Sequence, residues 1–225
     1  MKKVIVFIFA ILMSVYAMYA QTTKDIIKER KQIANLSQSE LNARASKVAH
    51  KEAKKLTKEG WIVAPGQLPL EKQLDKSYNM NYEYEESGLP KYIFGAAMSV
   101  GGVYDAAKMQ AIELAKSDLA SMIQTEVTSL IESTIGNEQI SQEDGASLVS
   151  TVKASKDLIV KKLGRTFTVI ECYKNLPNKA VQVRVVLAYN AKMAIDDAKA
   201  VIEKELELQG QDLHEQLDAI WEQNK

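Results

Sequence analysis

Residues 91–136 read KYIFGAAMSVGGVYDAAKMQAIELAKSDLASMIQTEVTSLIESTIG, and this stretch decides the fold. Its first part alternates apolar with small or polar residues up to Gly101 and Gly102, with Tyr92, Phe94, Ala96, Met98 and Val100 expected to form the apolar face of a strand. Apolar residues then recur at helical spacing up to Gly136, namely Ala107, Ala111, Ala115, Leu119, Met122, Ile123, Val127, Leu130 and Ile131. The stretch predicts a strand followed by a long alanine-rich helix.

Residues downstream of this helix predict a second helix and a β-hairpin. The second helix is expected over residues 141–162 and the first hairpin strand over residues 165–174. After a loop at residues 175–178, residues 180–189 predict a returning strand that is buried on one face. The apolar positions of this returning strand are Val181, Val183, Val185, Leu187 and Tyr189.

Further helices are predicted on both sides of this region. Residues 25–36 predict a short basic helix, and a capping box at Ser37 predicts a second helix that runs to about Lys58. Pro69 suits the first turn of another helix. Asn190 is expected to cap a helix through Leu208, and the last amphipathic helix carries Leu213, Leu217, Ile220 and Trp221.

The order of these elements predicts an α+β fold. We expect a small antiparallel sheet, built in the order strand, helix, helix, strand, strand, and covered by the long alanine-rich helix. The predicted regions are a signal peptide (residues 1–20), a mainly helical N-terminal region (21–90), an α+β core module (91–189) and C-terminal helices that pack on the core (190–225).

The run from Val100 to Ile123, followed by Leu163-Gly-Arg165 and a valine-rich hairpin, resembles the LPP-twenty lipoprotein family of bacterial envelope proteins. It is also similar to exported proteins of gut Bacteroidetes. The resemblance covers residues 91–189 and implies a strand-helix-strand-strand module that serves protein contacts rather than chemistry. It transfers no catalytic residue, and the chain departs from the family because it lacks a lipobox cysteine.

The first twenty residues have the order of parts of a secretory signal peptide. Lys2 and Lys3 precede an apolar run at residues 4–15, and small residues lead to an expected cleavage after Ala20, with Ala17 as the alternative. The apolar run is shorter than the roughly 20 residues that span a bilayer. We therefore expect an exported chain with no membrane span after cleavage, located in the periplasm, at the outer membrane or outside the cell. The only cysteine, Cys172, lies too far downstream to carry a lipid.

Charge is balanced overall but unevenly distributed. Without residues 1–20 the chain keeps 205 of its 225 residues, with 27 Lys and Arg against 29 Asp and Glu, which gives no indication of nucleic-acid binding. Residues 22–60 carry ten basic and five acidic side chains, whereas residues 191–225 carry four basic and nine acidic ones. This complementarity predicts that the terminal helices pair within one chain.

Candidate reactive residues are few, and no catalytic, cofactor or metal site is predicted. His214 and Asp218 share a helix face but supply only two ligands where zinc needs three or four. His50 stands among lysines as a surface residue, and Cys172 is expected to be a buried structural cysteine. Three acids among tyrosines, Glu83, Glu85 and Glu86, fit no calcium loop and predict an exposed connector.

These patterns favour a non-enzymatic envelope protein that contacts other envelope proteins or a second copy of itself as a homo-oligomer. The basis is the signal peptide, the order of helices and strands, and the scarcity of reactive constellations. Two alternatives remain open: an envelope hydrolase that uses carboxylates, and a carrier of a small hydrophobic ligand.

Overall fold

A computed structural model describes residues 28, 31, 44–86, 88–137, 140–210 and 212–222. The chain divides into two compact units, residues 1–44 and 45–225, and the second holds nearly all of the described residues. The predicted signal peptide lies outside the described residues. Of the basic helix predicted over residues 25–36, only Lys28 and Lys31 are described, and both are helical.

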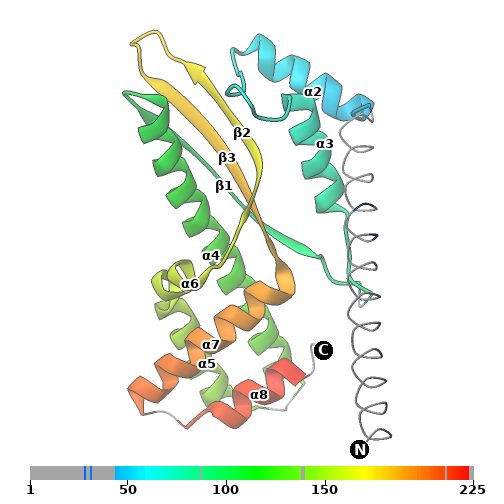
Figure 1. The fold of residues 1–225 in the computed structure, drawn as a ribbon. Coiled ribbons are helices and arrows are strands. Elements are labelled where there is room, and N and C mark those ends of the chain that lie inside the picture. The colour runs from blue at the N-terminus through cyan, green and yellow to red at the C-terminus, as the bar shows by residue number, and fades with distance from the viewer. Residues whose placement is uncertain are drawn as a thin grey trace, which may run out of the picture. The chain divides into compact units, whose positions relative to one another are not determined.

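The second unit is an α+β structure, as predicted (Figure 1). Its described helices are α2 (Lys47–Lys58), α3 (Leu70–Asn81), α4 (Tyr104–Gly136), α5 (Gln142–Ala154), α6 (Lys156–Lys162), α7 (Ala191–Gln209) and α8 (His214–Glu222). Its described strands are β1 (Tyr92–Gly101), β2 (Phe167–Asn175) and β3 (Val181–Asn190).

The three strands form one antiparallel sheet in the order β1-β3-β2, so β3 is central. Strands β2 and β3 form the predicted hairpin, whereas β1 joins β3 from far away in the sequence, with Tyr92 opposite Asn190. The register of β2 shifts between Thr168 and Ile170. This bulge interrupts the predicted alternation, and Val169 and Ile170 are both buried as a result.

The long helix α4 covers one face of the sheet with its N-terminal half (Figure 1). Three alanines of α4 are fully buried against three apolar residues of β3, the set being Ala107, Ala111, Ala115, Val183, Val185 and Leu187. This confirms the alanine-rich covering helix and the predicted apolar face of the returning strand. Burial on one face only is wrong, because Val186 and Ala188 of the opposite face are buried as well. Met122, which was expected in the buried stripe of α4, is 44% exposed.

The strand prediction for β1 is confirmed, but its predicted core face is wrong. Met98 and Val100 are exposed, whereas Gly95 and Ser99 face α4 and are buried. The reason is the close approach of α4, since a Cβ atom at Gly95 would lie 2.3 Å from the carbonyl oxygen of Ala115. Only small side chains fit at such a contact, so the side of β1 that packs on the helix is the one with little apolar bulk.

Helices α2 and α3 cover part of the other face, over β2 and β3. The hydroxyl of Ser46 caps α2 by accepting a hydrogen bond from the amide of Ala49 at 3.3 Å. The sequence predicted one helix from Ser37 to about Lys58, whereas residues 44–46 are not helical and α2 begins at Lys47. Residues 37–43 lie outside the described part of the chain. Helix α3 is present as predicted, but Pro69 is its N-cap and not part of its first turn.

The C-terminal half of α4 extends past the sheet and forms a helical cluster with α5, α6, α7 and α8. The predicted single helix over residues 141–162 divides at buried Ser155, whose hydroxyl donates to the carbonyl of Thr151 at 2.7 Å. Asn190 caps α7, and Gly210 ends it in the left-handed conformation, with φ of 65°. The apolar residues predicted for the last helix are buried in this cluster.

Among the described residues, no helix combines the length and the apolar character that a membrane span requires.

Candidate interaction surfaces

Helix α2 presents a strongly basic surface. Its five lysines, Lys47, Lys51, Lys54, Lys55 and Lys58, are all exposed, while its apolar side is buried against α3. None of the five forms an ion pair within the part of the chain that the structure describes. At the edge of this surface, His50 pairs with Glu71 of α3 at 2.7 Å beside a shallow depression that Lys54 and Lys58 also line. We call these five lysines the basic face.

The turn between α7 and α8 presents the opposite charge. From Glu203 to Asp218 the sequence has six acidic residues and one lysine. Glu203 and Asp218 both bind Lys199, which ties α8 to α7. The other acids are Glu205, Glu207, Asp212 and Glu215, of which the last three are exposed. We call Glu207, Asp212 and Glu215 the acidic corner.

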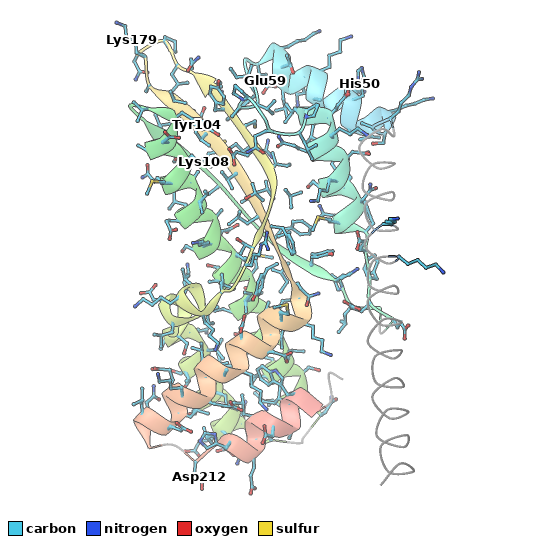
Figure 2. The ribbon with its side chains drawn as sticks, in the orientation of Figure 1. His50, Glu59, Tyr104, Lys108, Lys179 and Asp212 are labelled. Atoms are coloured by element: carbon cyan, nitrogen blue, oxygen red, sulfur yellow. The ribbon has the colours of Figure 1, made fainter. Side chains whose placement is uncertain are left out.

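The predicted pairing of the basic and acidic helices within one chain is wrong for α2. This helix packs on α3, while α7 and α8 pack on the helical cluster of α4. His50 and Asp212 mark the two surfaces at opposite ends of the second unit (Figure 2). The buried residues of α2 are two alanines and one leucine, which fill the space over α3, so packing rather than charge decides its place. Both charged surfaces are therefore exposed among the described residues.

A buried polar cluster that was not predicted from the sequence joins α3, α4 and β2. The Glu171 side chain, 5% exposed, accepts hydrogen bonds from the Tyr104 hydroxyl and, at 2.8 Å, from the Lys108 ammonium group. The amide of Glu171 donates to the Gln73 side chain at 2.7 Å. Tyr173 packs edge-on against Tyr104.

This cluster holds Tyr104 in its protonated form. Burial and the hydrogen bond to Glu171 raise the pKa of Tyr104, so its hydroxyl remains a donor. Figure 2 shows Tyr104 and Lys108 on the first turns of α4, beside the sheet. Among the described residues, no fully buried side-chain atom of this cluster lacks a hydrogen-bond partner, which is the arrangement of a structural clamp. The sequence does hold one signal for this cluster, the acidic residue Glu171 inside a run of β-forming residues at 167–173.

Cys172 is buried with no exposed surface, as predicted. Burial raises the pKa of its thiol from 9.0 to about 11. The thiol is therefore protonated and poorly reactive at neutral pH in the folded chain.

This shift predicts a pH dependence of stability. Above pH 9 the unfolded chain releases the Cys172 proton, while the folded chain keeps it up to about pH 11, so the free energy of unfolding falls across this window. Cys172→Ala is expected to remove up to about 2 kcal/mol of that fall. Urea denaturation of both chains at several pH values from about 8 to 11 measures the difference, and tyrosine ionisation affects both chains alike. Parallel stability curves would contradict the prediction.

The remaining candidates from the sequence lie apart from one another. His50 belongs to α2 and His214 to α8. The connector with the three acids is exposed, as predicted, and Glu83 pairs with Lys91 at 3.1 Å. Within the described ranges, no three His, Cys, Asp or Glu side chains come close enough together to hold a metal ion.

The fold and these surfaces define an α+β chain with two open surfaces of opposite charge. No family model matches the chain, and comparisons with curated proteins and with solved structures found no match. The resemblance to the LPP-twenty family stays a prediction.

Proposed function

We propose that the protein is an exported, non-enzymatic envelope protein that associates with further copies of itself. The observation that carries this proposal is the pair of open, complementary surfaces, the basic face of α2 and the acidic corner between α7 and α8. The predicted signal peptide supports export. The position of Cys172, far from the predicted cleavage site, supports a chain without a lipid anchor.

The basic face and the acidic corner carry opposite charges, so the contact joins the basic face of one copy to the acidic corner of the next. Such a head-to-tail contact is heterologous and repeats along a row of copies unless a ring closes. The macrodipole of α7 adds to the negative charge of the acidic corner, because α7 has no basic residue in its last turn.

The expected association is weak and depends on salt. Exposed ion pairs contribute roughly 0.2–1 kcal/mol each, so one pair for each of the three acids of the corner favours association only at high protein concentration. Screening lengths fall from about 30 Å at 0.01 M salt to about 3 Å at 1 M. Sedimentation equilibrium of the exported chain should therefore detect assemblies at low salt and monomers at high salt. A monomer at every concentration and salt would contradict self-association.

Charge exchange provides a sharper test of the two surfaces. One variant carries Lys51→Glu, Lys54→Glu and Lys58→Glu, and the other carries Glu207→Lys, Asp212→Lys and Glu215→Lys. Each variant alone has two surfaces of like charge and is expected to stay monomeric. An equimolar mixture restores two complementary contacts, because the unmodified corner of the first variant matches the unmodified face of the second and the two reversed surfaces match each other. The mixture is therefore expected to associate in alternating copies. Failure of the mixture to associate while the unmodified chain does so would place the contact elsewhere.

A further inference from the structure

The two edges of the sheet differ in how their backbone groups are used. At the β2 edge, Tyr173 and Ile62 exchange two backbone hydrogen bonds of 2.8 Å, and the Gln73 side chain accepts from the amide of Glu171. Segments next to α2 and α3 therefore close this edge. Closing an edge prevents the addition of a further strand.

The β1 edge is largely open. Strand β1 has ten residues with no charge and no proline, and it pairs with β3 on one side. On its other side the described residues provide one hydrogen bond, from the amide of Ala96 to the Asp118 carboxylate at 2.9 Å. Backbone groups alternate in direction along an antiparallel strand, so Phe94, Met98 and Val100 point their amides and carbonyls to the same edge as Ala96.

Apolar side chains flank this edge on both faces of the sheet. Met98 is 55% and Val100 is 49% exposed, because α3 packs over β2 and leaves this part of β1 uncovered. On the α4 side, Asp118 reaches the edge, and Leu114 and Met122 lie one turn before and after it on the same side of the helix. Both of these residues are exposed. A strand added here would bury apolar surface on both of its faces.

The position of α4 determines what can occupy the edge. Because α4 lies directly on β1 at Gly95, antiparallel pairing of β1 with β1 of a second copy would place two α4 helices on one face about one strand spacing apart. Strands are about 4.8 Å apart, whereas packed helices need 8–10 Å between their axes. A second folded copy therefore does not fit in antiparallel pairing, while an extended segment with no helix on that face does.

We propose that the free edge of β1 binds an extended, mainly apolar segment of another protein that places a lysine or arginine beside Asp118. The backbone supplies the main contacts by strand addition, and the exposed Met98, Val100, Leu114 and Met122 contact alternate side chains. Asp118 sets the charge preference, because its carboxylate reaches the amide of Ala96 at this edge. The contact uses neither the basic face nor the acidic corner.

Labelled synthetic peptides test the proposal by fluorescence anisotropy with the full exported chain. The probe has about ten alternating valines and threonines, the length of β1, with a central lysine, and a second peptide has glutamate in that place. We expect the lysine peptide to bind at least tenfold more tightly than the glutamate peptide. Asp118→Lys is expected to reverse this preference. No binding of the lysine peptide, or an unchanged preference in Asp118→Lys, would overturn the proposal.

A matched pair of variants locates the binding. Met98→Lys puts a charge at the edge and is expected to weaken peptide binding at least tenfold, whereas Met193→Lys on α7 is expected to have no effect. Both methionines are 55% exposed, so both variants should fold, which circular dichroism checks. Equal weakening by both substitutions would contradict binding at β1. Met98→Lys should leave the salt-dependent self-association unchanged, so the two proposals fail separately.

Discussion

Gly95→Ala is expected to lower the free energy of unfolding by about 3 kcal/mol, one of the two largest effects of a single substitution that we predict. The added methyl group would lie 2.3 Å from the Ala115 carbonyl oxygen and 2.6 Å from the Leu119 amide nitrogen. Both atoms belong to the backbone of α4, so no side chain can rotate away and the whole helix must shift from the sheet. Urea denaturation followed by circular dichroism measures the change.

Gly102→Ala is the matched control for this substitution. Gly102 follows β1 directly, and a Cβ atom there meets no other atom within 4 Å. We expect a change within about 0.5 kcal/mol, as for other surface substitutions. Similar losses of unfolding free energy in both variants would contradict the idea that the close contact between β1 and α4 excludes a side chain at position 95.

Lys108→Met is expected to destabilise the fold by about 3 kcal/mol, because it leaves the buried Glu171 carboxylate without its countercharge. Glu171→Met is expected to destabilise the fold less than Lys108→Met does, since the Lys108 side chain is 30% exposed and can turn to water when Glu171 is absent. Adding Glu171→Met to Lys108→Met should therefore recover part of the stability. Chemical denaturation of both single variants and the double variant gives the coupling energy.

The control for this cycle lies on the same helix. Lys116 pairs with Glu113 at 3.1 Å, but the Glu113 side chain is 66% exposed. Lys116→Met is expected to cost less than about 1 kcal/mol, as exposed ion pairs do. Additive effects of Lys108→Met and Glu171→Met would contradict the clamp that these two residues form.

The sequence predicted the elements that depend on local signals. Pro69 and Asn190 marked helix starts, and the alternation over residues 181–189 predicted the core face of β3. These signals act within a few residues and carry their own chemistry, such as the side-chain cap that Asn190 forms. The α+β class follows from their order.

The predictions that failed depend on contacts between distant residues. The face of β1 was chosen by apolar bulk, yet the close approach of α4 favours its small residues, Gly95 and Ser99. The charges at the two ends predicted an internal pairing, yet burial of Ala49 and Leu56 places α2 on α3. Asp118 gave no sequence signal, because its role depends on an edge that only the tertiary structure defines.

The position of β1 in the sheet has a consequence for how the chain folds. Strands β1 and β3 are neighbours in the sheet, yet residues 102–180 lie between them in the sequence. This intervening segment contains α4, α5, α6 and β2. Closing so long a loop costs entropy before any sheet contact forms, and high contact order slows folding. During synthesis, β1 and the helix that follows it must wait for β3 to emerge. Until then, an uncharged apolar strand has two free edges, which makes this interval the one at which the chain is most exposed to aggregation.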